Sequence, residues 1–171
     1  MSGAVTPTRL ETPRLILRPW RDSDREPFAR MNADPRVMEF FPACLSREQS
    51  DAIIDRNPGV LAAELRDTGE FIGFVGLAVP TFEAHFTPCV EIGWRIAAEH
   101  WGKGLATEGA REVLRHATGE IVSFTTERNF RSRRVMEKLG MNHDSADDFD
   151  HPRLPVGHPQ RRHVLYRFRS T

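Results

Sequence analysis

Residues 101–108 have the sequence Trp-Gly-Lys-Gly-Leu-Ala-Thr-Glu, between a strand-like run at 90–96 and a helix-like run at 106–117. Glycine lets backbone N–H groups approach an anion closely, and the N-terminus of a helix adds partial positive charge. The pattern therefore predicts a turn that binds a phosphate group. A plain strand-turn-helix connection also needs small residues, so the loop alone leaves both interpretations open.

The composition is that of a soluble globular protein. The chain has 171 residues, and its 24 Lys and Arg balance 24 Asp and Glu, so the formal net charge is zero. The length predicts a single domain over residues 1–171, in which residues 1–9 form a flexible N-terminal tail without a signal-peptide core. A general nucleic-acid or anionic-membrane binder would carry a basic excess, so neither partner is expected.

The cysteines and the apolar runs indicate the cellular compartment. Cys44 and Cys89 have no metal-type spacing and form no disulfide framework, so we expect free thiols in a reducing cytoplasm. No apolar run approaches the roughly 20 residues that a membrane-spanning helix needs. A cytoplasmic enzyme or binding domain fits these observations.

Hydrophobic patterns and turn residues predict alternating groups of strands and helices. Strands are expected at 15–20, 60–65, 71–79, 90–96, 121–126 and 163–169, and helices at 22–32, 46–56, 106–117 and 129–139. Ser46 and Gln49 form a capping box, and Asn129 is a second helix cap. The polar, proline-containing stretch 144–159 is predicted to be a long loop. This order indicates a mixed α/β fold and not a doubly wound sheet.

A second motif, Asn129-Phe130-Arg131-Ser132, precedes Met136-Glu137-Lys138-Leu139-Gly140-Met141. Together with the glycine loop, it resembles the GNAT superfamily of N-acetyltransferases, and most closely the RimJ/RimL-like branch. The resemblance covers about residues 10–169. It implies an α/β (α+β) fold with a mixed, mostly antiparallel twisted sheet of about six to seven strands, flanked by helices, whose central parallel strands splay apart. It also allows a homodimer.

The resemblance implies acetyl-CoA as cosubstrate. Backbone amides of the glycine loop would hold its diphosphate. Its pantetheine arm would pair with backbone groups of Trp94 and Ile96 on the splayed strand, where Gly93 suits a bulge or bend. The loop residues assigned to the cosubstrate are Trp101, Gly102, Lys103, Gly104, Ala106 and Thr107. Trp101 replaces the Gln or Arg usual in the family. The alternative is a packed central strand without a ligand.

Glu91 is the candidate general base. Aminolysis of a thioester needs a neutral amine, so a base should stand near the nucleophile. A carboxylate in an otherwise apolar strand is out of place, and alternation puts Glu91, Gly93 and Arg95 on one face. Family members often carry a glutamate on this strand. An exposed glutamate, or one paired with Arg95, is the alternative.

The leaving thiolate of CoA needs only modest help, because thiols titrate near pKa ~8.5. Many relatives use a tyrosine in the helix after the splayed strand, but the single tyrosine, Tyr166, lies in the last predicted strand. Resemblance to the RimJ/RimL-like branch makes Ser132 the group nearest the sulfur and Asn129 a contact of the pantetheine arm. Their alternatives are a first-turn serine and an ordinary helix cap.

Further polar and aromatic residues surround these motifs. The basic cluster Arg128, Arg131, Arg133, Arg134 and Lys138 either includes a contact of the CoA 3′-phosphate or is a solvated face. Stretch 143–163 holds four histidines and four aspartates but matches no zinc or calcium pattern, so no metal is expected. It is predicted to overhang the acceptor pocket with His151, His158 or Arg161. The residues Trp20, Phe40, Phe41, Phe82 and Phe86 either line that pocket or belong to the core.

These residues predict an acetyl-CoA-dependent N-acetyltransferase that moves acetyl by direct attack of a primary amine, either a small molecule or a peptide N-terminus. The alternative is a non-catalytic acyl-CoA-binding or sensor module of the same fold. A weaker third hypothesis is a nucleotide-binding domain of another fold that uses the glycine loop alone. The identity of the acceptor is not encoded in any motif.

Overall fold

A computed structural model describes residues 8–170 of the chain. Residues 1–7 of the predicted tail lie outside the described residues. The strands are β1 (Leu10–Glu11), β2 (Leu15–Arg18), β3 (Val60–Leu65), β4 (Phe71–Ala78), β5 (Val90–Ile96), β6 (Glu120–Thr126), β7 (Asn142–His143), β8 (Phe149–Asp150) and β9 (Arg162–Arg169). The α-helices are α1 (Arg25–Asn32), α2 (Arg47–Arg56), α3 (Leu105–Arg115) and α4 (Phe130–Lys138), and the short 3₁₀ helices are η1 (Asp22–Asp24), η2 (Ala98–His100) and η3 (Ser145–Asp147). None of the helices in residues 8–170 is both long and apolar enough to cross a bilayer.

The strands form one sheet in the order β1-β2-β3-β4-β5-β6-β9-β7, with β8 also paired to β9. Every pair is antiparallel except β5 with β6, which is parallel. This confirms the mixed, mostly antiparallel fold. The six longer strands correspond to the six predicted ones, and the other three have only two residues each. Segments that short carry no periodic signal, which is why part of the predicted loop 144–159 is η3 and β8 instead.

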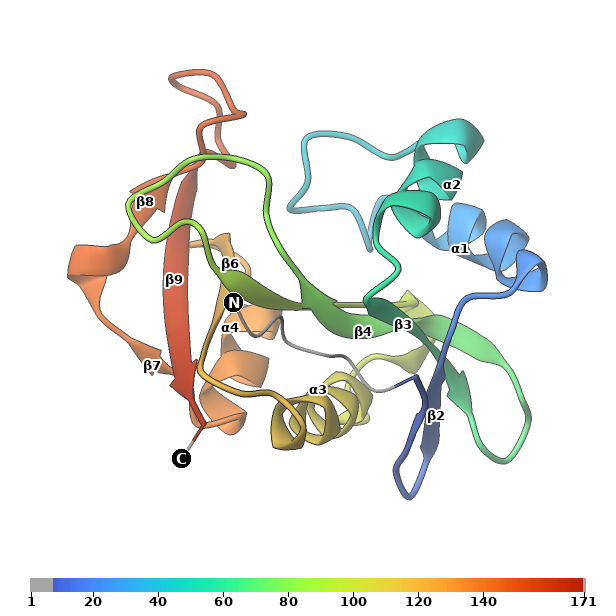
Figure 1. Ribbon diagram of the computed structural model, residues 1–171. Helices are drawn as coiled ribbons and strands as arrows, with labels where there is room; N and C mark the ends of the chain where they lie inside the picture. Colours follow the sequence, from blue (N-terminus) through green and yellow to red (C-terminus); the bar gives the residue numbers. More distant parts are fainter. Residues whose placement is uncertain (1–7, 171) are drawn as a thin grey trace.

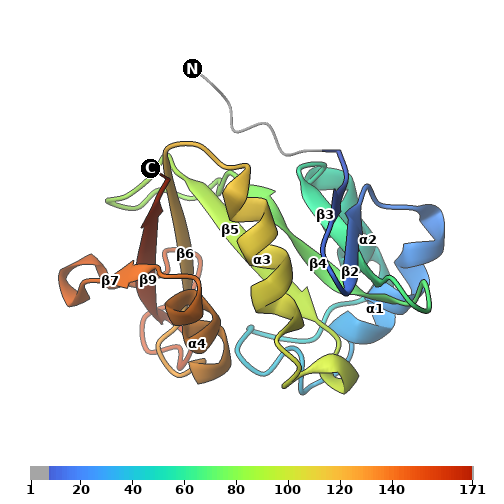
Figure 2. The same cartoon turned by 90° about the horizontal axis from the view of Figure 1, so that it is seen from below.

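Helices cover both faces of the sheet (Figures 1 and 2). The main core lies under α3 and α4, where Ile92 and Val113 are fully buried. On the opposite face α1 and α2 pack over the sheet, and Phe28 is buried against Trp20 and the aromatic rings of β4. The loop before α2, the β4–β5 connection and the stretch after β8 lie on the α1 and α2 side (Figure 1).

The helix ends follow the predicted local chemistry. Ser46 accepts from the Gln49 backbone N–H, and the Gln49 side chain accepts from the Ser46 N–H, which completes the capping box. Asn129 accepts from the Ser132 backbone N–H at the start of α4. Gly140 ends that helix with φ of 77°, a conformation that glycine adopts without steric cost.

The prediction of a bulge at Gly93 is wrong. β5 pairs with β4 in continuous register from Glu91 to Ile96, with Gly93 opposite Gly76. The unusual backbone is at Gly73, whose φ is 144° and whose missing Cβ would lie 2.0 Å from the Arg95 carbonyl oxygen. At Gly93 a Cβ would meet only the Glu91 carboxylate, at 3.9 Å. Glycine at 93 therefore keeps space open.

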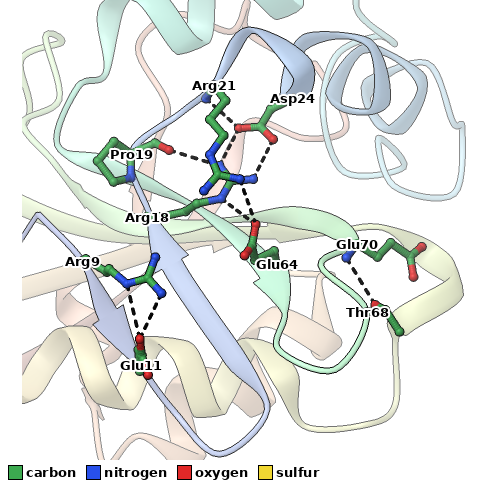
Figure 3. A network of polar contacts seen from close by, with 9 residues as sticks. All are labelled: Arg9, Glu11, Arg18, Pro19, Arg21, Asp24, Glu64, Thr68 and Glu70. Atoms are coloured by element: carbon green, nitrogen blue, oxygen red, sulfur yellow. Dashed lines mark hydrogen bonds and ion pairs between the residues drawn. The ribbon is translucent and has the colours of Figure 1, made fainter.

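A buried ion cluster joins η1 to the sheet (Figure 3). The Arg18 guanidinium on β2 donates to both carboxylate oxygens of Asp24, at 2.8 and 2.9 Å, and its Nε donates to Glu64 on β3 at 2.6 Å. Arg18 and Asp24 are almost fully buried, and Glu64 nearly so. Charge-assisted, bidentate pairing of this kind compensates the desolvation of all three groups.

We expect Arg18→Met to destabilise the fold by about 3–5 kcal/mol, because it removes the buried cation from two buried carboxylates and leaves only the exposed Arg21, at 3.7 Å, near Glu64. Equilibrium denaturant unfolding measures the change. The matched control is Arg9→Met, which removes the exposed pair with Glu11 in the same hairpin and should cost at most about 1 kcal/mol. Equal effects of the two substitutions would contradict this account of the cluster.

Candidate active site

The site begins where the two parallel strands separate. β5 and β6 pair at only two positions, Val90 with Ile121 and Glu91 with Val122. One step further the Ser123 hydroxyl donates to the Ile92 carbonyl at 3.0 Å. Beyond that contact no backbone ladder joins the two strands within residues 8–170. The remaining length of β5 therefore has a free edge.

The free edge carries the backbone groups of Trp94 and Ile96. The Ala97 N–H donates to the carbonyl of Ile72 in β4, and backbone groups alternate along a strand. The groups of residues 92, 94 and 96 consequently point toward β6, as the Ile92 carbonyl does. The Trp101 indole donates to the Ile96 carbonyl at 2.8 Å, so the Ile96 N–H and both groups of Trp94 remain for a ligand.

The glycine loop leads from this edge into the N-terminus of α3. Gly104 is the cap, with φ of 76°, and its carbonyl accepts from the Glu108 N–H. In the described part of the chain, the backbone N–H groups of residues 102–107 have no protein acceptor. Unpaired amides at a helix N-terminus form an anion site.

Ion pairing holds this loop in place. The Glu108 carboxylate in the first turn of α3 accepts from the Thr12 hydroxyl at 2.7 Å and from Arg14 Nε at 2.7 Å. Arg14 also donates to the Lys103 carbonyl at 2.8 Å. The pKa of Glu108 lies below its usual value, because hydrogen bonds from Thr12 and Arg14 outweigh its partial burial. The anion site is thus fixed to the β1–β2 hairpin.

A cavity of about 770 Å³ extends from the loop, through the gap, to the face that carries α1 and α2. Its size is within the range of small-molecule sites. Nearly all the residues predicted for the site line it, namely Glu91, Trp94, Ile96, Trp101, Gly102, Gly104, Ala106, Thr107, Asn129 and Ser132. Lys103 does not line it, and its side chain is exposed.

The start of α4 forms one wall of the cavity. Asn129 uses its side-chain oxygen for the cap and its Nδ2 to donate to Thr125 at 3.0 Å, so its capping role accounts for most of its hydrogen-bonding capacity. Arg131, Arg134 and Lys138 also line the cavity. Arg131 stacks over the Trp101 ring, 3.8 Å from its centroid. Of the predicted basic cluster, Arg128 and Arg133 lie outside the wall.

Glu91 lies in the cavity on the α1 and α2 side of the sheet. No residue among 8–170 forms an ion pair or hydrogen bond with its carboxylate, so neither of the alternatives considered for it, full exposure or pairing with Arg95, is found. Burial raises the pKa of Glu91 from 4.5 to about 8. Desolvation disfavours the charged form, so this carboxyl is largely protonated at pH 7. A pKa near the working pH suits a general base.

The rest of the wall on this face is aromatic and basic. Phe40, Phe41 and His151 line the cavity, whereas Trp20, Phe82, Phe86, His158 and Arg161 do not. For Phe40 and Phe41 this is the first of the two alternatives considered. Phe82 and Phe86 pack in an aromatic cluster with Phe124 and Phe149 instead. Residues not predicted there include Arg95, Arg153 and His163. In the sequence, only the alternation of residues 91, 93 and 95 on one face of the strand points to Arg95.

His151 and His163, on this wall, are poor cations. Burial, with smaller contributions from His163 and Arg153, lowers the pKa of His151 to about 4. Burial also lowers the pKa of His163. Their rings lie 5.0 Å apart. In the described chain, no group of three His, Cys, Asp or Glu side chains could hold a metal ion.

Comparison with known proteins identifies relatives of this chain. The model of the acetyltransferase (GNAT) domain matches residues 14–142. The FsC-acetyl coenzyme A-N(2)-transacetylase of Aspergillus fumigatus is 33% identical over 161 residues, which cover 84% of this chain and 68% of that protein.

Solved structures share the fold. A GNAT-family acetyltransferase from Bacillus anthracis matches with a TM-score of 0.78 at 23% identity, covering 94% of this chain and 97% of that one. RimJ of Mycobacterium smegmatis, in complex with CoA-disulfide, matches with a TM-score of 0.72 at 20% identity, covering 98% of this chain and 90% of that one.

The raised pKa of Glu91 predicts how stability depends on pH. Above about pH 4.5 the unfolded chain releases a proton that the folded protein keeps until about pH 8, so wild-type stability falls across this window. Glu91→Gln has no such proton. Between pH 5 and 8 the melting temperature of Glu91→Gln, relative to that of the wild type, should therefore rise by several degrees. At this chain length, 1 kcal/mol of stability corresponds to about 2–4 °C.

Scanning calorimetry of both proteins across pH 5–9 measures this gap. Glu83→Gln, at an exposed position of the β4–β5 connection, is the control and should show no such trend. A gap between Glu91→Gln and the wild type that stays constant with pH would contradict the raised pKa.

Proposed function

The chain belongs to the acetyltransferase (GNAT) domain family and is an acetyl-CoA-dependent N-acetyltransferase, and we propose that it transfers acetyl by direct attack of a primary amine of a small molecule or a peptide N-terminus. The observation that carries the proposal is the gap between β5 and β6, which opens onto the unpaired amides at the start of α3. We further propose that residues 1–171 form a single domain. The free thiols Cys44 and Cys89 favour a cytoplasmic enzyme.

The amides of the glycine loop have the chemistry to hold the CoA diphosphate. Those of Gly102, Gly104, Ala106 and Thr107 provide donors beside the positive end of α3. Arg131, Arg134 and Lys138 add positive charge on the same side for the remaining phosphate. We assign Trp101 an indirect role, because its indole fixes the loop to Ile96. Lys103 contributes through its backbone only.

The pantetheine arm extends along the free edge of β5 in this proposal. Its amides alternate like those of a peptide, so the Trp94 backbone groups and the Ile96 N–H can pair with it as with an added strand. One of these donors is available to the carbonyl oxygen of the thioester as negative charge develops there. The protein's own contribution to binding is thus largely backbone.

Acetyl transfer forms a C–N bond and breaks the C–S bond. The attacking amine must lose a proton, and we assign Glu91 in its ionised form to receive it, directly or through water. The sulfur leaves as a thiolate, which needs little protonation because thiols are acidic. We place the Ser132 hydroxyl nearest to it, since this side chain lines the cavity at the first turn of α4 and makes no hydrogen bond to described residues.

A RimJ/RimL-like identity is the finer part of the proposal. Its support is the Asn129-x-x-Ser132 motif and the structural match to RimJ of Mycobacterium smegmatis. The name of the Aspergillus fumigatus relative gives acetyl coenzyme A and an N(2) position, and a small-molecule amine is the second candidate acceptor in the proposal. Both acceptors present a primary amine, so the same chemistry serves either of them.

Glu91→Gln tests the base. We expect it to lower kcat by about 10²–10⁴-fold while CoA affinity stays unchanged, because general base catalysis supplies a factor of that order. The ratio of wild-type to variant rates should rise with pH and level off above about pH 8, where Glu91 is ionised. This ratio cancels the titration of the amine itself.

Thiol release from acetyl-CoA with a panel of amines and N-terminal peptides gives the rates, and calorimetric titration with CoA gives the affinities. An unchanged rate in Glu91→Gln would remove Glu91 from the mechanism. CoA binding without thiol release for any amine would favour the acyl-CoA sensor over an enzyme.

A further inference from the structure

Arg95 is the second charged residue on the Glu91 face of β5, and it lines the same cavity. Its guanidinium lies 4.4 Å from the centre of the Phe41 ring and 5.5 Å from that of Phe74. Nη1 donates to the Asn32 side-chain oxygen on α1 at 2.7 Å. Aromatic rings therefore flank the group and a neutral amide binds one of its five N–H donors.

The charge of Arg95 has no counterion in the described chain. No carboxylate of residues 8–170 forms an ion pair with it, and its Nε is buried without a hydrogen-bond partner. Burial lowers the pKa of Arg95 only to about 10, so the side chain is charged at neutral pH. Burying an unpaired cation is costly. The same molecule shows the usual solution at Arg18, which has two carboxylates of its own.

Neutral residues support Arg95 from behind. Asn32 and Ser50 are both fully buried, and Asn32 Nδ2 donates to the Ser50 hydroxyl at 2.8 Å. This pair orients the guanidinium without neutralising it. The other N–H donors on Nη1 and Nη2 of Arg95 have no hydrogen-bond partner among the described residues, and we assign them to a ligand in the cavity.

The surrounding wall also lacks negative charge. Among the described residues that line the cavity, Glu91 is the single acidic one, and its raised pKa keeps it mostly neutral at pH 7. Arg153 adds a second cation on this side, with His151 and His163 uncharged. A cationic polyamine would meet repulsion here, whereas an anionic group would be attracted.

We propose that Arg95 binds a carboxylate of the acceptor, so that the substrate is a primary amine that also carries a carboxylate. This inference rests on the proposed acetyl transfer and names its substrate class. A planar guanidinium binds a carboxylate through parallel N–H donors, which fixes its orientation. The carboxylate is either the main-chain group of an amino acid or the side chain of an acidic N-terminal residue.

The test compares matched acceptors with and without the carboxylate. One arm uses L-phenylalanine and L-leucine against their amides, and the other uses tripeptide amides that begin with Glu or Asp against those with Gln or Asn. In the wild type we expect kcat/KM to favour the carboxylate member of at least one arm by about 10- to 100-fold, the worth of a hydrogen bond to a charged group. The arm that responds identifies the source of the carboxylate.

Two variants remove the preference by different routes. Arg95→Met deletes the cation and keeps an apolar stem. Asn32→Asp is nearly isosteric and puts a carboxylate at hydrogen-bond distance from Nη1, so it occupies Arg95 from within. Both should reduce the preference to within about twofold and retain CoA affinity. Arg30→Met, at an exposed position of the same helix α1, should keep it.

Binding gives a second readout that does not depend on turnover. Calorimetric titration of the CoA-loaded protein uses the acetylated products of the arm that responds, either N-acetyl-L-phenylalanine and its amide or the N-acetyl tripeptide amides that begin with Glu and Gln. It should show the same preference in the wild type and its loss in both variants. Acetyl transfer without any preference, or a preference that survives in Arg95→Met, would overturn the inference and leave the proposed function intact. Carboxylate-dependent binding without transfer to any amine would support the site and refute the proposed function.

Discussion

The structure depends on one interruption, the end of the β5–β6 ladder after two paired positions. A buried strand cannot leave its backbone groups unpaired without cost, so the protein must satisfy them or reserve them for a ligand. Ser123 and Trp101 satisfy the carbonyls of Ile92 and Ile96. What remains is a short row of donors and acceptors that continues into the amides before α3. An extended molecule with alternating amides and an anionic end complements this row, and in the proposed function this backbone irregularity is the binding site for coenzyme A.

Electrostatics divides the cavity into two parts. On the α4 side, exposed cations lie near the start of α3, where phosphates are expected, and solvent can screen them. On the α1 side, Glu91 and Arg95 are partly buried and line the cavity, and burial shifts both pKa values in the direction that favours the neutral form. A neutral acid beside a cation that has no counterion differs from the buried cluster at Arg18, where oppositely charged groups pair within the protein. The Arg18 cluster stabilises the fold, whereas the two groups on β5 are proposed to act on a substrate.

The sequence predicts those features that depend on neighbouring residues. Apolar runs predict the strands, and the capping residue Asn129 predicts the start of α4. Glu91 stands out because it is a charged residue in an otherwise apolar strand. Arg95 lies on the same face of the strand as Glu91. Its proposed role depends, however, on the contact with Asn32, which is 63 residues away, and on a loop that no hydrophobic periodicity predicts. Gly93 misleads because a glycine can mark a bulge or keep space open, and only the register with β4 distinguishes these. The loops that line the acceptor pocket are the least predictable part, because their contacts also depend on residues far apart in the sequence.

The two ionisable groups on β5 are related through the charge of the acceptor. The Cα atoms of residues 91 and 95 are about 13 Å apart along the strand. A Cβ at Gly93, between them, would meet only the Glu91 carboxylate. An amine that carries a carboxylate enters as a zwitterion, so it brings no net charge into a cavity that would resist an ammonium ion alone. A carboxylate bound at Arg95 adds negative charge near Glu91. Negative charge nearby disfavours ionisation of a carboxyl, so it keeps the pKa of Glu91 high. A base of high pKa is the stronger proton acceptor once ionised, so the anchor for one end of the substrate also strengthens the group that deprotonates the other.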